Sequence, residues 1–576
     1  MKLNYKRTLL VGFAFFLISA FWQAYDTIIP LMLTNKFGLN QFWSGIIMSL
    51  DNILALFMLP LFGALSDKKD TRFGKRTPFI VIGAIAAIVC FVGLTFVDQA
   101  QLNKVRQGST EIYWSQTVEG TDDLIEIENR EYNEFTNNKV PEFYTVRDYA
   151  AKVKYNKTFD NLTAEEKAAL ESWYKKELTY DTKYHYNKST DTYTLVEEGV
   201  DLPKDALTTN AYSSLVSDAE AQFAATVMKA NWWILLIFIA VLLMVLISMA
   251  TFRSPAVALM PDVTVKPLRS KANAIINLMG TAGGILVLLL GMAFGTGTVK
   301  NQLMNYTWFV LAVCGIMLAA LIVFIFTVKE KRWNAEMLEE QAKLDEEEAA
   351  KEKEGGSEVA TDEVATPKKE KLPKDKLVSL ILILASVALW FTGYNAITSK
   401  YSVYAVNVLN KDYNTTLLIA QAAAIISYIP VGIIASKIGR KKSILIGVAL
   451  LTAAFGGAIF INASTPGWTM YILFALAGIA WATINVNSFP MVVELSKGGN
   501  IGQYTGYYYT ASMAAQVITP ILSGGLMTLF KSMGILFPYA TIFVAMSFVT
   551  MLFVKHGDSR PEAPKDKMEM LAGADD

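Results

Sequence analysis

The sequence predicts an all-α membrane protein with twelve transmembrane helices in two groups of six. Three observations support this: 53% of the 576 residues are hydrophobic, only 18% are charged, and long apolar runs recur along the chain. A typical soluble domain carries roughly 25% charged residues. The mean hydropathy of +0.33 agrees with a chain that lies largely in lipid.

A helix needs about 20 mostly apolar residues to cross the roughly 30 Å hydrocarbon core of a bilayer. Six runs of this length precede a long charged segment, at about 9–33, 42–65, 78–98, 231–261, 272–295 and 306–328. Six more follow it, at about 377–405, 413–436, 443–463, 468–493, 502–530 and 535–555. The first run is too long for a secretory signal and has no small-residue cleavage site.

Basic residues in the short loops predict how the chain is oriented. They gather on one side, in the loops near residues 2–7, 68–76, 266–271, 437–442 and 497. The loops expected on the other side hold little beyond Lys36 and Lys300. Because basic loops face the cytoplasm, we expect a multi-pass protein of the cell membrane with both termini in the cytoplasm.

Two polar segments interrupt the apolar runs. Residues 99–229 are acidic and Tyr-rich, and we expect a small folded extracytoplasmic insert that either captures substrate or is passive. Within it, the sequence Thr163-Ala164-Glu165-Glu166 is typical of a helix-starting capping box. Residues 329–376 are a charged, partly helical cytoplasmic linker. The predicted domains are an N-terminal bundle (1–98 and 230–328), the insert, the linker, a C-terminal bundle (377–556) and a cytoplasmic tail (557–576).

Composition excludes several classes of function. Lys plus Arg and Asp plus Glu both number 52, so no net positive charge favours nucleic acid as a partner. The two cysteines, Cys90 and Cys314, lie in apolar runs and exclude a disulfide framework and a cysteine zinc site. Two histidines offer little for a histidine relay, and no G-x-x-x-x-G-K-[ST] nucleotide loop is present. We therefore expect no enzymatic activity, metal or cofactor.

The loop after the second run reads GALSDKKDTRFGKRTPFI, residues 63–80. Its carboxylate, Asp67, can pair with a base or face a helix N-terminus, and its cations lie near helix C-terminal carbonyls. The second half repeats the pattern weakly as GIIASKIGRKK, residues 432–442, which suggests an internal duplication. We predict a cytoplasmic gate whose contacts form when the two bundles meet. Its residues are Asp67, Arg72, Lys75, Arg76, Arg440 and Glu494.

The frame GxLSDxxxxRxGxR resembles the loop-two motif of the major facilitator superfamily. The longer string SDKKDTRFGKRTPFI is similar to the sucrose-transporter and solute-carrier-45 group and to the glycoside–pentoside–hexuronide cation symporters. SPAVALMPDVTV, residues 254–265, resembles the P-x-R-A-L-x-x-D segment of sucrose transporters, although Val257 stands at the Arg position and Arg253 lies one turn earlier. The resemblance implies a major facilitator fold of two six-helix bundles and a sugar or glycoside as substrate.

Ionisable side chains inside a membrane span are costly and mark functional sites. Asp26 lies in the first run and Asp51 in the second, and each could hold a proton, pair with a sodium ion or be satisfied by a neighbouring donor. We predict proton coupling through Asp26 and Asp51. Asp262 is a third candidate, either as a proton site or gate residue or in an ion pair with Arg269 or Lys271.

Two further observations concern ionisable residues of the spans. The acidic pair of melibiose-type symporters would fall at Ala55 and Leu59, which disfavours a sodium site of that kind. Lys400, in the seventh run, is expected to extend to the membrane surface.

Sugars present hydroxyls and flat C–H faces, so their sites combine amides and carboxylates with aromatic rings. The predicted substrate-binding residues are Trp22, Gln23, Tyr25, Asn52, Tyr394, Asn395, Trp481, Asn485, Asn487 and Tyr508. Together these features favour a proton-coupled symporter of a sugar or glycoside, disaccharide-like in size, that works by alternating access.

The sequence leaves three alternative functions open. They are an efflux antiporter for amphipathic compounds, a sodium-coupled sugar symporter, and a membrane sensor in which the insert binds ligand. Amides within the spans favour the sugar symporter over the efflux carrier, which would need a more apolar cavity. We expect a monomer in the lipid bilayer.

Overall fold

The structure is a computed structural model of the chain. It describes residues 3–69, 71–113, 155, 157, 161–169, 184–187, 192–195, 201–203, 224–265, 268–298, 303–354, 373–409, 411–462, 465–493, 495, 501–530 and 532–556. Within these ranges, eleven helices are long and apolar enough to cross a membrane. Another helix, α13, has 26 residues and also reaches the length of a span. These twelve helices follow the twelve apolar runs in order.

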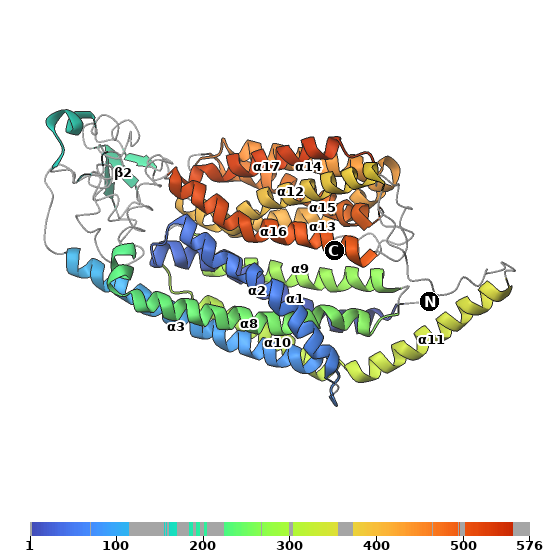
Figure 1. The fold of residues 1–576 in the computed structure, drawn as a ribbon. Helices are drawn as coiled ribbons and strands as arrows, with labels where there is room; N and C mark the ends of the chain where they lie inside the picture. Colours follow the sequence, from blue (N-terminus) through green and yellow to red (C-terminus); the bar gives the residue numbers. More distant parts are fainter. Residues whose placement is uncertain are drawn as a thin grey trace.

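The chain folds into two halves of six long helices each (Figure 1). The N-terminal half contains α1 (Tyr5–Leu31), α2 (Gln41–Lys68), α3 (Thr77–Tyr113), α8 (Trp232–Asp262), α9 (Arg269–Phe294) and α10 (Thr307–Thr327). A short π-helix, η1 (Met32–Lys36), follows α1. The C-terminal half contains α12 (Lys374–Asn407), α13 (Tyr413–Ile438), α14 (Arg440–Ala458), α15 (Gly467–Val493), α16 (Ile501–Leu529) and α17 (Leu536–Leu552), with a 3-10 turn, η7 (Met533–Ile535), before α17.

Two names describe the ends of the bundle from here on. The terminus side is the end where α1 and α12 begin and α17 ends, and the insert side is the end where α3 ends and α8 begins. The linker helix α11 (Glu330–Glu354) lies at the terminus side (Figure 1). It confirms the partly helical linker, whereas α3 continues as a helix to Tyr113, well past residue 98.

Parts of the segment expected as an insert are described. They include an antiparallel sheet of β1 (Tyr184–Asn187), β2 (Thr192–Leu195) and β3 (Asp201–Pro203), paired in the order β1-β2-β3. The capping box is confirmed, because the Glu166 amide donates to the Thr163 hydroxyl at 3.2 Å and the Thr163 amide donates to the Glu166 carboxylate at 2.9 Å. Most of residues 99–229 beyond α3 lie outside the described ranges.

Close helix packing forms the core of each half. In the N-terminal half, α1 packs along α9 and α3 along α8, while in the C-terminal half α13 packs along α15 and α12 along α17. Gly283 on α9 permits the first of these contacts, because a Cβ there would lie 2.6 Å from the Phe16 carbonyl oxygen. Small residues have this role in membrane helices, where close approach of backbones drives association.

A buried ion pair lies at the insert-side end of the N-terminal half. Lys36 on η1 and Asp98 on α3 form it, and both side chains are fully buried. The Lys36 ammonium also lies 4.4 Å from the centre of the Tyr306 ring, and the Gln101 amide donates to the Lys36 carbonyl at 2.9 Å. This pair joins α3 to the end of α1.

We expect Asp98→Asn to reduce stability by about 3–5 kcal/mol, because it leaves a buried ammonium without its counter-charge. Thermal unfolding of the detergent-purified protein should show a lower Tm. The double variant Lys36→Met/Asp98→Leu should recover most of the loss, since it removes both charges together. Asp375→Asn, an exposed acid at the start of α12, is the control. A Tm for Asp98→Asn equal to that of the control would contradict this account of the pair.

Candidate functional site: a central cavity and the contacts on either side

A cavity of about 550 Å³ lies between the two halves. Helices α1, α8 and α9 line it from the N-terminal half, and α12, α13, α14 and α15 line it from the C-terminal half. This volume is within the range of small-molecule sites in proteins. Among the predicted substrate residues, the cavity brings together Trp22, Gln23, Tyr394 and Trp481.

Two stacked aromatic rings form one wall of the cavity. Tyr394 on α12 and Trp481 on α15 have ring centres 3.5 Å apart and planes within 6° of parallel. Phe391 contacts the Trp481 ring edge-on, at 5.3 Å between ring centres, and supports it from outside the cavity lining. The C-terminal half thus offers the cavity a flat, rigid aromatic surface.

An amide pair joins the halves beside this wall. The Gln421 side-chain amide on α13 donates to the Gln23 side-chain oxygen on α1 at 2.6 Å. The other polar atom of Gln421, its Oε1, is buried and has no hydrogen-bond partner among the described residues. Within the same part of the chain, Asn277 Nδ2 and Trp22 Nε1, also on cavity-lining residues, are likewise buried without a partner. These atoms offer one acceptor and two donors to a ligand.

Charged residues occupy the N-terminal wall. Asp26 and Arg253 line the cavity, and the Arg253 guanidinium lies 5.6 Å from the centre of the Trp22 ring. Asp51 on α2 interacts electrostatically with both Asp26 and Arg253. Its carboxylate accepts from the Asn52 backbone amide at 2.6 Å and from the Asn52 side chain at 2.8 Å. The two carboxylates and the guanidinium therefore lie within electrostatic range of one another.

The remaining predicted substrate residues do not line this cavity. They are Tyr25, Asn52, Asn395, Asn485, Asn487 and Tyr508. Tyr25 is buried inside the N-terminal half against Phe21. Asn487 donates to the Thr483 carbonyl within α15 at 2.9 Å, and the Tyr508 hydroxyl pairs with Ser488 at 2.9 Å. The Asn487 amide thus binds its own helix and the Tyr508 hydroxyl a neighbouring one, whereas Tyr25 Oη and Asn395 Nδ2 are buried without a hydrogen-bond partner among the described residues. The sequence alone does not distinguish such contacts from ligand contacts.

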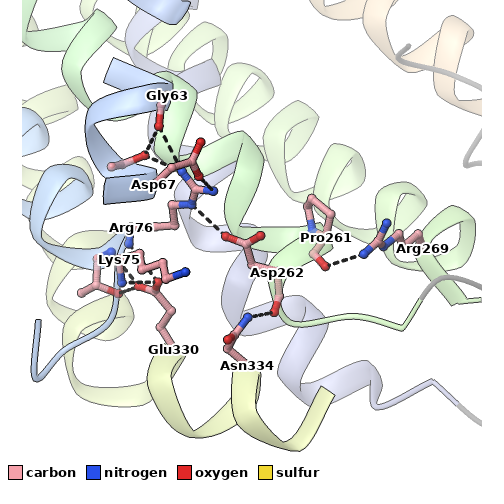
Figure 2. A network of polar contacts seen from close by, with 11 residues as sticks. Gly63, Asp67, Lys75, Arg76, Pro261, Asp262, Arg269, Glu330 and Asn334 are labelled. Atoms are coloured by element: carbon pink, nitrogen blue, oxygen red, sulfur yellow. Dashed lines mark hydrogen bonds and ion pairs between the residues drawn. The ribbon is translucent and has the colours of Figure 1, made fainter. Parts of the chain in front are cut away.

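Arg76 is the centre of a polar network on the terminus side (Figure 2). Its Nε donates to Asp262 at 2.8 Å, and its terminal nitrogens contact Asp67 and Ser66. Desolvation opposes the charged guanidinium, but Asp262 and then Asp67 outweigh it and raise the pKa of Arg76 above its ordinary value. The network joins α2, α3 and α8 within the N-terminal half.

Within the described residues, Asp262 does not pair with Arg269, one of its two predicted ion-pair partners. Its carboxylate pairs with Arg76, while Arg269 donates to the carbonyls of Pro261 at 3.1 Å and Thr264 at 3.2 Å. The Lys271 side chain lies outside the described residues. The structure therefore places Asp262 in the terminus-side network, away from the Asp26 and Asp51 carboxylates.

Glu330, the first residue of α11, binds the N-terminus of α3. Its two carboxylate oxygens accept from the backbone amides of Lys75 at 2.6 Å, Arg76 at 2.8 Å and Thr77 at 2.7 Å. The Thr77 hydroxyl adds another hydrogen bond at 2.7 Å. Gly74, with φ of 116°, allows this approach, because a Cβ there would collide with the Glu330 carboxylate. Helix N-termini favour such anions.

Further contacts hold α11 against the N-terminal half. The Asn334 side chain donates to the Asp262 carbonyl at 2.6 Å (Figure 2). Arg7 of α1 forms an ion pair with Glu336 and lies 5.0 Å from the centre of the Trp333 ring. Sequence reasoning missed Glu330, which was one of many acids in a charged segment.

The predicted gate residues are thus arranged differently from what we expected. Asp67, Lys75 and Arg76 make their contacts within the N-terminal half and with α11, rather than across to the C-terminal half. Arg72 lies over the Phe73 ring at 4.9 Å. Arg440 is the first residue of α14, and Glu494 lies outside the described residues.

On the insert side the halves are in direct contact. Asn407 of α12 donates to the Asn35 side chain at 2.7 Å, and Lys400 donates to the Gln41 carbonyl at 2.9 Å. Thr296 accepts from the Tyr413 hydroxyl at 2.8 Å and the Asn414 amide at 3.0 Å. The prediction that Lys400 extends to the surface is wrong, because its side chain is fully buried. These contacts close the cavity on the insert side.

We expect Glu330→Gln to weaken the docking of α11 by about 1–2 kcal/mol, because a neutral amide is a poorer cap for the α3 N-terminus. Hydrogen–deuterium exchange of residues 330–354 should become roughly tenfold faster, since 1.4 kcal/mol corresponds to a factor of ten. Glu339→Gln is the matched control, because Glu339 lies on α11 and pairs only with exposed Lys343. Equal exchange in the two variants would contradict the capping role of Glu330.

Comparisons with known proteins agree with this architecture. A family model described as Major Facilitator Superfamily matches residues 220–520 and 413–572, and one described as MFS/sugar transport protein matches residues 10–105. An uncharacterized MFS-type transporter of Methanocaldococcus jannaschii is 30% identical over 127 residues, which are 22% of this chain and 30% of that protein. The match therefore spans less than a third of that relative.

Solved structures share the fold at low identity. A D-xylose-proton symporter is 12% identical with a TM-score of 0.50, and the match covers 96% of this chain and 99% of that one. A bacterial homologue of the iron transporter ferroportin in an inward-facing state is 11% identical, also with a TM-score of 0.50, with 96% and 99% covered. Since the first family model matches more than half of the chain, this membrane protein belongs to the major facilitator superfamily and is a transporter.

Proposed function

We propose that this transporter is a proton-coupled symporter of a sugar or glycoside that works by alternating access between its two halves. One observation carries the proposal: Asp26 and Arg253 line the same cavity as the stacked Tyr394 and Trp481 rings. An ion-coupling group and a sugar-sized aromatic surface thus share one space. The family model described as MFS/sugar transport protein supports the same substrate class.

The charges of the cluster suggest how a proton would act. With Asp26 and Asp51 both ionised against Arg253, the N-terminal wall carries one surplus negative charge. A surplus charge in a poorly hydrated site is unfavourable. A proton bound by either carboxylate removes this surplus negative charge. The protonated cluster is therefore neutral, and this is the state suited to reorientation of the halves.

The other wall offers groups suited to a neutral sugar. The C–H face of a pyranose can stack on the Trp481 and Tyr394 rings. Its hydroxyls are both donors and acceptors and can satisfy Gln421 Oε1, Asn277 Nδ2 and Trp22 Nε1, which lack partners in this structure. The cavity of about 550 Å³ accommodates a ligand of disaccharide size.

The loop charges suggest which way the cavity opens. Basic loops on the terminus side predict that this side is cytoplasmic. The insert side would then be extracytoplasmic, and the contacts of Asn35 with Asn407 and Lys400 with Gln41 would close the cavity to the outside. We propose this orientation in the cell membrane, with a monomer as the working unit.

Uptake of a labelled disaccharide into proteoliposomes, driven by an imposed pH gradient, tests the proposal. We expect accumulation in the wild type and its loss, by tenfold or more, in Asp26→Asn or Asp51→Asn. Exchange of sugar at equal concentrations should survive in these variants, because asparagine resembles a protonated aspartate. Asp375→Asn, outside the cavity, is the control.

Two results would contradict the proposal. One is accumulation driven by a sodium gradient without a pH gradient, which would favour sodium coupling. The other is extrusion of amphipathic dyes with no sugar flux, which would favour an efflux carrier.

The aromatic wall makes a separate prediction. Trp481→Leu should raise the KM for the sugar about tenfold, because ring stacking contributes roughly 0.5–1.5 kcal/mol beyond area burial. Phe391→Leu is the matched control, since Phe391 contacts Trp481 but does not line the cavity, and it should change KM much less. Concentration-dependent uptake measures both values. Equal KM values for the two variants would exclude direct stacking on Trp481.

A further inference from the structure

Lys400 has an unusual position for a lysine. It lies on α12 where the two halves meet at the insert side, and its side chain is 0% exposed. Its ammonium donates to the backbone carbonyl of Gln41, the first residue of α2 in the other half, at 2.9 Å. The contact therefore exists only while the halves are together on this side.

The described surroundings of Lys400 provide no counter-charge. The described helices that pack against α12 (α1, α13, α15, α16 and α17) place no charged side chain against it, nor does α2. In their insert-side halves these helices carry the titratable groups Tyr25, Asp26, Tyr413, Tyr471 and Tyr539, none of which interacts electrostatically with Lys400.

The acids nearest the insert side have other partners. Asp98 is paired with Lys36, and Asp412 caps α13 by accepting from the Asn414 and Thr415 amides. The neighbouring phenol, Tyr401, donates to Thr416 at 2.8 Å. Lys400 is thus left with a single backbone acceptor in the described part of the chain.

The Gln41 backbone is closely packed. Gly524 of α16 packs so closely that a Cβ there would collide with the Gln41 carbonyl oxygen. The Gln41 side-chain oxygen and the Ser44 hydroxyl are also buried, and neither has a hydrogen-bond partner in the part of the chain that the structure describes. An ammonium enclosed here would lose its hydration and gain one neutral acceptor, which is an unfavourable exchange for a full charge.

We propose that Lys400 is a proton-binding site of the insert-side closure. While the halves are apart, water surrounds the side chain and it holds the proton as an ammonium. As they close, an N–H bond breaks, the proton passes to water on the insert side, and the neutral amine keeps its hydrogen bond to Gln41.

The sign of the pH effect follows from linkage. Because closure releases a proton, the closed-to-open ratio rises with pH, by up to tenfold per pH unit for one proton. Acid therefore holds the insert side open, and alkali closes it. This inference concerns the resting equilibrium of the halves and does not depend on which substrate or ion is transported.

Lys411 is a matched control within the same molecule. It also lies on the insert side, and its ammonium also donates to a backbone carbonyl, that of Thr465, at 2.6 Å. Both partners belong to the C-terminal half, so separation of the halves leaves this contact intact. The backbone acceptor of Lys400 therefore belongs to the opposite half and that of Lys411 to its own half, and Lys411 is also partly exposed whereas Lys400 is fully buried.

Distances between spin labels on the full-length protein in nanodiscs test the proposal without substrate. The labels replace Trp43 and Phe460, which are exposed at the insert side of opposite halves. The background carries Cys90→Ala, Cys314→Ala, Asp26→Asn and Asp51→Asn, so that the two carboxylates do not contribute a pH response of their own. In the wild type, the short-distance population should grow from pH 6 to pH 9. Lys400→Met and Lys400→Gln should stay closed across this range, and Lys400→Arg, which keeps its charge, should stay open.

The controls decide the interpretation. Lys411→Met should keep the pH response of the wild type. A wild-type pH response that persists in Lys400→Met or Lys400→Gln would overturn the proposal, as would a wild type without any pH response. Loss of the response in Lys411→Met would overturn it too, because the effect would then not depend on the contact between halves. Failure of sugar uptake would contradict the proposed symport and leave this result unchanged.

Discussion

A charge enclosed between membrane helices needs a partner, and this constraint organises the whole protein. Lys36 is paired with Asp98 at the insert side, and Arg76 is paired with Asp262 and Asp67 at the terminus side. At two other sites the charges are incompletely paired. At the cavity, Arg253 lies within electrostatic range of two carboxylates, Asp26 and Asp51, and at the contact between halves the described part of the chain gives Lys400 one backbone acceptor. These matched pairs join helices within the N-terminal half, and the incompletely paired groups lie at the cavity and at the contact between the halves.

The linker helix α11 is attached to one of the two halves. Because Glu330 caps α3 and Arg7 pairs with Glu336, α11 belongs to the N-terminal half. The chain that connects the two halves is then the stretch after Glu354 and before Lys374. The Arg76 network lies directly beside the Glu330 cap, so α2, α3, α8 and α11 move as one unit on the terminus side. Cavity residues on α1 and α9 are supported by that unit.

The sequence predicts the fold well because length and hydropathy determine each span independently of its neighbours. It also names Asp67 and Arg76, which lie near one another in the chain, as members of one motif, and Tyr394 and Trp481 as separate substrate candidates, but it does not predict that these two rings stack. Gln421 and Glu330 were missed, and Lys400 was placed wrongly, because their roles depend on helices distant in sequence. A polar residue such as Asn487 looks identical in the sequence whether it serves a ligand or, as here, the Thr483 carbonyl.

The central claim is that the Asp26, Asp51 and Arg253 cluster binds one proton for each sugar carried. The proton-to-sugar ratio, obtained from the membrane potential at which a fixed sugar gradient produces no net flux in proteoliposomes, tests it most directly. The account predicts a ratio of one, set by the single surplus charge of the cluster. A flux that reverses at the same sugar gradient whatever the pH difference and membrane potential would mean that no proton accompanies the sugar, and it would contradict the account.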